Sequence, residues 1–169
     1  MLILGIDPGL NKTGWGIIRV TGNNIKFVAS GLIKTKASDP LYHRLATLDA
    51  GISEVVKQYS PDVAAIEETF MNNNAASALK LGQARGVVLT APARAGLAVY
   101  EYGANKIKKS VVGNGHATKT QIGMMIGVLL PQAGKISEDE ADALAIGICH
   151  AHHIPAIKRE ERLVELAAE

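Results

Sequence analysis

The hydrophobic pattern of the chain begins with an unbroken apolar run at residues 2–6, LILGI. Because this run leaves no polar face, it predicts a strand that is covered on both sides of a sheet. The run ends at Asp7, and Pro8-Gly9 then predicts a turn, since Pro fixes φ and Gly accepts a positive φ. We therefore expect a carboxylate at the end of a central strand.

Two loosely alternating segments follow, at residues 13–20 and 25–35, and the turn sequence TGNN separates them. With the first run they predict an antiparallel meander of three strands. Apolar residues then recur at helical spacing over residues 41–59, after a Ser-Asp-Pro start. A second covered strand is predicted at residues 63–66, and it also ends in carboxylates, Glu67 and Glu68.

The rest of the chain alternates between helical and strand-like segments. We expect a long helix over 75–94, a strand over 97–102, a short basic helix over 105–112, a helix capped by Thr118 and ended by Pro131, and a helix opened by a capping box at 137–140. This order predicts an α/β fold with a five-stranded mixed sheet flanked by helices. We expect one domain over 1–153 and a loosely attached C-terminal tail over 154–169.

Composition adds limits to this picture. The length of 169 residues and the 47% hydrophobic content are typical of one globular domain. The single cysteine, Cys149, excludes an internal disulfide and agrees with a reducing compartment. The start lacks the basic segment of a signal peptide, and the longest later apolar stretch, 122–130, is too short to span a bilayer. We expect a soluble, cytoplasmic protein.

The formal charge of +2 hides an uneven distribution. Residues 80–121 hold seven Lys or Arg against the single acid Glu101. A solvated protein face is one explanation. The other is a nucleic-acid surface, because the lysines lie on a short helix and beside the loop 113–116, GNGH, whose Gly-flanked backbone lets a phosphate chain approach closely.

Four carboxylates are candidates for a shared site. Asp7 and Glu67 end apolar strands, whereas Asp139 and Asp142 lie three residues apart on one helix face. Carboxylates without Cys or His form a hard oxygen site that suits Mg²⁺ or Mn²⁺, and two such ions about 4 Å apart clamp the oxygens of a reacting phosphodiester.

Purely structural roles are the alternative for these acids. Asp7 could bond only the backbone of its own turn, and the acids at 138–140 could only complement the helix dipole. Asp142 lies beyond that first turn, so the dipole explains it less well.

Other residues are ambiguous from sequence alone. Phe70 follows Glu67 in a loop rich in Asn, where it could stack on a base or belong to the core. His150, His152 and His153 lie where we expect a helix to end, so helix-dipole complementation is the alternative to a metal role.

Five motifs occur in order along the chain: ILGIDPG followed by TGWG, then AIEETF, SALKLGQARG, VVGNGHATK and DEADALAIG. This series resembles the RuvC family of Holliday junction resolvases, bacterial endonucleases of the ribonuclease H-like fold. The resemblance covers about residues 1–153. The first motif alone also resembles the phosphate loop of sugar kinases and actin-like ATPases.

The resemblance implies roles for individual residues. Asp7, Glu67, Asp139 and Asp142 would be the metal-binding catalytic carboxylates; Lys108 and Lys119 would face the scissile DNA, and Phe70 would contact the junction. Glu68 and Glu140 add charge beside two of these acids, so spacing alone does not fix which neighbour binds the metal. Lys119 would also offset the negative charge that develops during hydrolysis.

The resemblance further implies magnesium dependence, with manganese as a substitute, and a homodimer that nicks opposing strands of four-way DNA symmetrically. It also implies cooperation with the RuvA and RuvB branch-migration proteins. For the dimer we expect small residues of the helix 75–94 to face a symmetry mate, namely Ala76, Leu79, Gly82, Gln83 and Gly86. The alternative is that this helix face packs on the protein's own sheet.

Two other functions remain in competition. An actin-like phosphotransferase shares the opening motif, but it needs a second domain to close on a nucleotide. A junction-binding protein without catalysis would keep the basic surface but would have no need of four acids.

Overall fold

The structure is a computed structural model that describes residues 1–68 and 74–168. Its elements are β1 (Leu2–Asp7), β2 (Lys12–Thr21), β3 (Asn24–Lys34), α1 (Leu41–Tyr59), β4 (Val63–Glu68), α2 (Ala75–Arg94), β5 (Ala98–Gly103), α3 (Ala104–Val112), α4 (Lys119–Leu129), a 3-10 turn (Pro131–Ala133) and α5 (Glu138–Ala168).

The sheet has the order β3-β2-β1-β4-β5. β1, β2 and β3 form the expected antiparallel meander, while β4 pairs in parallel with β1 and with β5. The predicted five-stranded mixed sheet is therefore confirmed. β1 and β4 are central strands, and their apolar runs are buried because helices cover both faces of the sheet.

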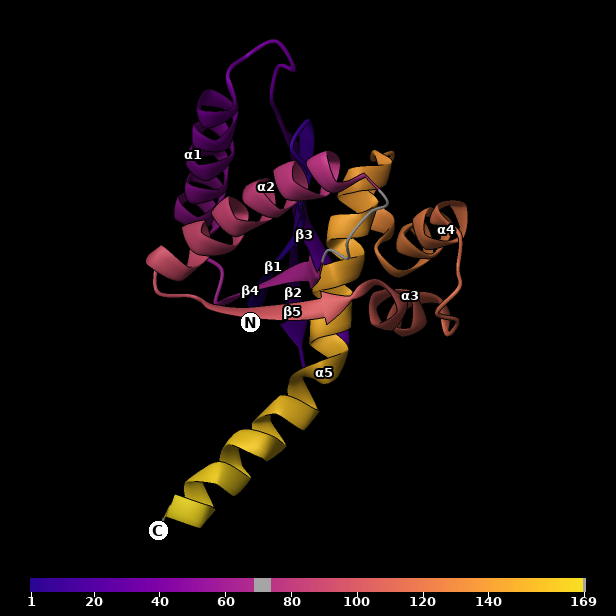
Figure 1. Cartoon of the computed structure of the whole chain (residues 1–169). Helices are drawn as coiled ribbons and strands as arrows, with labels where there is room; N and C mark the ends of the chain where they lie inside the picture. The colour runs from indigo at the N-terminus through magenta and orange to yellow at the C-terminus, as the bar shows by residue number, and fades with distance from the viewer. Residues whose placement is uncertain (69–73, 169) are drawn as a thin grey trace.

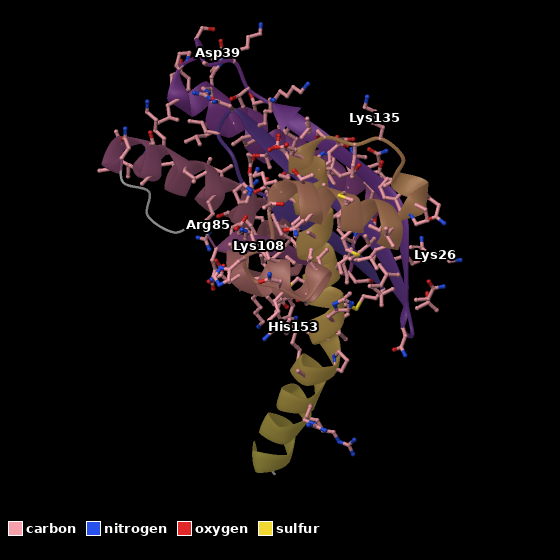
Figure 2. All side chains as sticks on the ribbon, turned by 90° about the vertical axis from the view of Figure 1, so that its right-hand side faces the viewer. Lys26, Asp39, Arg85, Lys108, Lys135 and His153 are labelled. Atoms are coloured by element: carbon pink, nitrogen blue, oxygen red, sulfur yellow. The ribbon has the colours of Figure 1, made fainter. Side chains whose placement is uncertain are left out.

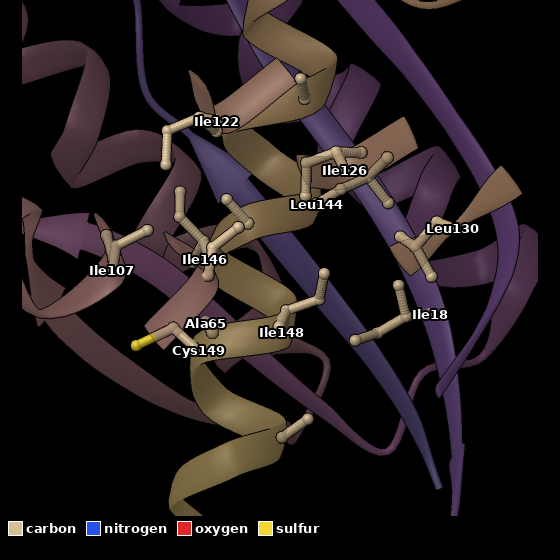
Figure 3. Packing of buried hydrophobic residues seen from close by; sticks show 14 of the residues in the cluster. Ile18, Ala65, Ile107, Ile122, Ile126, Leu130, Leu144, Ile146, Ile148 and Cys149 are labelled. Atoms are coloured by element: carbon tan, nitrogen blue, oxygen red, sulfur yellow. The ribbon is translucent and has the colours of Figure 1, made fainter. Parts of the chain in front are cut away.

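Helices cover both faces of this sheet (Figure 1), and a hydrophobic core lies on each face. On one face, α1 and α2 pack through side chains such as Leu48, Ile52 and Val88. On the other face, α5 lies along the sheet, and α3 and α4 pack outside it through Ile107 and Ile122 (Figure 3).

The first half of α5 approaches the sheet unusually closely. A Cβ atom added at Gly5 would lie 2.0 Å from the carbonyl oxygen of Ala143, and one added at Gly14 would lie 2.0 Å from that of Asp139. Only glycine fits at these two positions. The close approach brings the acidic start of α5 to the end of β1 where Asp7 lies.

Helix starts follow the predictions in two cases and differ in one. Thr118 caps α4 through the Gln121 N–H, and Ser137 and Glu140 form the capping box of α5. At α1 the Ser-Asp-Pro start predicts a cap followed by Pro in the first turn, which is wrong: Pro40 itself occupies the N-cap position and makes no side-chain hydrogen bond.

The C-terminal segment continues α5, which runs to Ala168 with Pro155 inside it. Its last turns project away from the sheet (Figure 1). The division of the chain at residue 153 stays a prediction. Within the part of the chain that the structure describes, no helix combines the length and the apolar character needed to cross a membrane.

Candidate active site

Two carboxylates lie side by side at the ends of the central strands. Ile6 pairs with Ile66 in the parallel β1–β4 ladder, so Asp7 and Glu67, the next residues, are neighbours at the same edge of the sheet. Both side chains line a pocket of about 230 Å³. The two strand ends therefore meet, as a site shared by Asp7 and Glu67 requires.

The helices on the α5 face supply the rest of this pocket. Asp142 enters from the second turn of α5, Lys108 from α3, and Lys119 from the first turn of α4. Ile107, Ile122 and the start of α3 form its apolar wall. Three of the four predicted carboxylates and both predicted lysines therefore share one pocket, which we call the acidic pocket.

Asp139 lies beside the acidic pocket rather than in its wall. It borders an adjacent hollow with Glu138 and the turn at residues 9–12, while its backbone packs on Gly14. Its charge still acts on the pocket, because it helps to raise the pKa values of Asp7 and Asp142.

The acids disfavour one another's ionised form. Burial, followed by the charges of Asp142, Glu67 and Asp139, raises the pKa of Asp7 to about 8. Burial and Asp142 likewise raise the pKa of Glu67, although Lys108 and Lys119 act in the opposite direction. The acids therefore resist ionising together in this pocket, and an added cation would favour their ionised forms.

Lys119 pairs directly with one of these acids. Its Nζ lies 3.2 Å from Oδ2 of Asp142, and the negative charge of Asp142 raises the pKa of the ammonium group. Burial nevertheless keeps the pKa of Asp142 above its ordinary value, so Lys119 compensates only part of the cost of burial. The lysine side chain is 61% exposed, which leaves it accessible to a second anion.

The neighbouring glutamates have other roles or positions. Glu140 accepts hydrogen bonds from Ser137 and Ser30, and these bonds hold its pKa below the ordinary value against the opposing effect of burial. Glu68 is exposed at the end of β4. Neither lines the acidic pocket; this distinguishes Glu67 from Glu68, whereas Asp139 and Glu140 both lie outside the pocket wall.

Arg85 of α2 supports the strand end that carries Glu67. Its Nε donates to the Glu67 carbonyl oxygen at 3.4 Å, and its guanidinium pairs with Glu101 of β5. Arg85 and Lys108 lie on the same face of the molecule (Figure 2). Sequence reasoning counted Arg85 only as part of a basic segment, and no local signal indicated its contact with β4.

The histidines are not at a helix end, so the helix-dipole interpretation is wrong. α5 continues beyond them, and His150 is a core residue, 1% exposed, whose Nδ1 lies 2.8 Å from the Tyr102 hydroxyl. Burial and His153 lower the pKa of His150 to about 4. Phe70, predicted to contact DNA, lies outside the described residues.

The acidic pocket suits a hard divalent cation by its chemistry. Its donors are carboxylate oxygens with Lys nearby, and the raised pKa values of these acids show that their ionised forms lack the partner that a divalent cation would provide. Over residues 1–68 and 74–168, no three or more His, Cys, Asp or Glu side chains lie in an arrangement that could hold a metal ion by themselves. Water or substrate oxygens would have to complete any coordination shell here.

Comparisons with known proteins point to one family. The family model described as crossover junction endodeoxyribonuclease RuvC matches residues 3–150. A protein of that name from Paramagnetospirillum magneticum is 57% identical over 90% of this chain and 92% of its own length. Another from Brucella anthropi is 52% identical over 98% of this chain and 96% of its own length.

A solved structure gives the same result. "T. thermophilus RuvC in complex with Holliday junction substrate" is 34% identical and superposes with a TM-score of 0.82 over 89% of this chain and 93% of that chain. The five-stranded mixed sheet with its flanking helices is thus a ribonuclease H-like fold. By sequence and by fold, the chain belongs to the RuvC family of crossover junction endodeoxyribonucleases.

Proposed function

We propose that this protein resolves four-way DNA junctions by hydrolysing phosphodiesters in two opposing strands, as part of DNA recombination and repair. One observation carries the proposal: Asp7, Glu67 and Asp142, from two strands and a helix, meet in one pocket with Lys108 and Lys119. Acids bind the cations that nuclease chemistry needs, and lysines bind the phosphates of the substrate.

The roles of the pocket residues follow from their surroundings, and the role of Phe70 follows from the family resemblance. Asp7 and Glu67 hold divalent cations, and Asp142, with Asp139 at the pocket edge, completes the carboxylate set. A carboxylate with a raised pKa, such as Asp142, is suited to accept the proton of the attacking water. Lys119 offsets the negative charge that develops on the phosphate, and Lys108 and Phe70 contact the DNA.

The cofactor that fits these donors best is Mg²⁺, with Mn²⁺ as a substitute. When bound, it supplies Lewis-acid polarisation of the scissile phosphate. The carboxylates of this chain hold the ion in place, while the apolar wall of Ile107 and Ile122 limits the access of bulk water.

Paired nicking requires two sites, and we propose that α2 provides the homodimer interface. Ala76, Leu79, Gly82, Gln83 and Gly86 are all exposed, so this helix face is not covered by the protein's own sheet. Added Cβ atoms at Gly82 and Gly86 would meet no neighbour within 4 Å, which leaves room for another helix. A two-fold dimer would present two acidic pockets to the two-fold symmetric junction.

The family resemblance also supports a proposal for where the protein acts and with which partners. Junctions on which the enzyme acts are expected in the cytoplasm, where the RuvA and RuvB branch-migration proteins would cooperate with it.

A nicking assay tests the proposal. A synthetic four-way junction, end-labelled on each strand in turn, is incubated with protein and Mg²⁺, and a linear duplex of the same sequence is the control. We expect symmetric cuts in two opposing strands of the junction, no cuts in the duplex, and none with EDTA. Binding without cutting under all conditions would favour the non-catalytic junction-binding protein instead.

A further inference from the structure

A buried cation lies behind the turn that follows Asp7. Arg44 projects from α1 and is only 9% exposed. Across residues 1–68 and 74–168 it forms no ion pair with a carboxylate. Burial of an unpaired guanidinium is costly unless hydrogen bonds satisfy it, so its contacts indicate what it stabilises.

All the hydrogen bonds that Arg44 donates reach the turn or the strand end beside it. Its Nε donates to Thr35 Oγ1 at 2.9 Å, and its Nη2 donates to the Leu10 carbonyl oxygen at 3.2 Å and to Asn11 Oδ1 at 2.5 Å. Thr35 closes the network, because its hydroxyl donates to the same Leu10 carbonyl and its backbone N–H donates to the Asn11 carbonyl.

The same turn faces the acids on its other side. Residues 9–12 border the hollow that contains Glu138 and Asp139. The turn is tight, since the Thr13 hydroxyl donates to the Gly9 carbonyl at 2.8 Å and a Cβ at Gly9 would lie 2.1 Å from the Lys12 carbonyl. It therefore lies between the guanidinium of Arg44 and the acidic start of α5.

We propose that Arg44 is a positioning residue for the nuclease reaction: it fixes the turn at residues 8–12 and thereby the placement of Asp7 relative to Asp139 and Asp142. This inference rests on the proposed function. An apolar side chain would fill the same space without the cost of a buried charge, whereas the cation orders the turn by binding its carbonyl and amide oxygens.

The geometry requires arginine rather than lysine. Two different nitrogens of the planar guanidinium serve Thr35 on one side and the turn on the other. A lysine has one compact ammonium group, which cannot occupy both places at once. Arg44→Lys therefore keeps the charge and most of the packing but loses part of the network.

The test compares Arg44→Lys and Arg44→Met with Arg94→Met, in which an exposed arginine that pairs with Asp49 is removed from the same side of the sheet. Asn11→Ala is a fourth variant, because Asn11 is exposed and its loss removes one acceptor without opening the core. For each protein we would measure the unfolding temperature, the junction affinity without metal, the Mg²⁺ concentration for half-maximal nicking, and amide hydrogen exchange at residues 9–12.

We expect Arg44→Lys to bind junctions within about twofold of the wild type but to need about tenfold more Mg²⁺, the order of effect typical of residues that orient metal ligands. Exchange at residues 9–12 should be faster in Arg44→Lys and Asn11→Ala and unchanged in Arg94→Met. If Arg44→Met fails to fold, the two milder variants still decide the question.

Two outcomes are distinguishable. Unchanged Mg²⁺ requirement and unchanged exchange in Arg44→Lys and Asn11→Ala would overturn the positioning role while the nuclease function stands. A wild-type protein that never nicks junctions would overturn the proposed function, and the exchange measurement would then still report whether Arg44 orders the turn.

Discussion

Three carboxylates of the acidic pocket are buried at the cost of their hydration. Asp7 and Glu67 are partly buried beside Asp142, and burial raises the pKa of each of the three acids. Lys119 reaches one of them at 3.2 Å and relieves only part of this cost. Such uncompensated charge is common at functional sites, where a ligand or ion supplies the missing partner.

The lysines give the first prediction at this scale. Lys108→Ala and Lys119→Ala should each weaken junction binding. Each should also make the slope of log affinity against log salt shallower by about 0.9, because a variant that lacks one phosphate contact releases fewer counterions when it binds DNA. Titrations at several salt concentrations measure the slope. Lys57→Ala, on α1 across the sheet, is the control and should leave it unchanged. An unaltered slope in both pocket variants would mean that neither lysine touches the DNA backbone.

Some of these residues were predictable from sequence and others were not. Asp7 and Glu67 were predictable because each follows an apolar run. The capping role of Glu140 is visible in the spacing Ser-Glu-Asp-Glu. The meeting of Asp142 with Asp7 depends on Gly5 and Gly14 admitting α5 to the sheet, and that is a tertiary contact.

Arg44 shows the same limit. It lies at the edge of the apolar stripe of α1, four residues before the buried Leu48, so helical spacing does not tell whether its side chain is buried or solvated. Its burial follows from the course of the turn at 8–12 and the end of β3, which no local pattern reveals.

At the scale of elements, α5 is the part that joins the site to the core. Its first turns carry the acids, and its middle is fixed to β5 by the hydrogen bond between His150 and Tyr102. The helix was predicted to end before Pro155, and the structure instead continues it, which places the histidines in the helix interior.

This contact gives a pH prediction. Burial lowers the pKa of His150 to about 4 from its ordinary 6.5, so the unfolded chain binds a proton between these values and the native protein does not. The stability from neutral His150 is fully present above pH 6.5 and is lost as the pH falls towards 4. Wild-type protein should therefore lose more unfolding free energy between pH 7 and pH 4.5 than His150→Gln does.

Denaturant unfolding at several pH values measures this difference. His152→Gln, at an exposed neighbouring position, is the control and should follow the wild type. Parallel pH profiles for wild type and His150→Gln would show that His150 does not stay neutral in the native protein.

For the whole molecule, the exposed face of α2 is where a second copy is expected. A shallow hollow between α1 and α2 borders Gln83 and Gly86, so the surface is shaped rather than flat. Leu79 on the same helix is 66% exposed, an apolar side chain that a partner would cover.

Gly82→Trp tests this interface. The position is open, so the indole fits the monomer and only a close partner helix would clash with it. We expect a folded monomer by sedimentation, with weaker junction binding and uncoordinated nicks. Gly82→Ala, which keeps the side chain small, should remain a dimer. A Gly82→Trp protein that dimerises as strongly as the wild type would place the interface elsewhere.

The central claim is that the carboxylates perform the hydrolysis whereas other groups bind the junction, and Asp7→Asn tests it most directly. Asn keeps the shape of the side chain but loses its charge, and it also removes one member of a crowded set of acids, so folding should be unimpaired without metal. Junction affinity and Mg²⁺-dependent nicking are measured on one preparation. We predict affinity within about twofold of the wild type and nicking slower by at least about a hundredfold. Near-normal nicking by Asp7→Asn would contradict the assignment of Asp7 as a metal-binding catalytic residue.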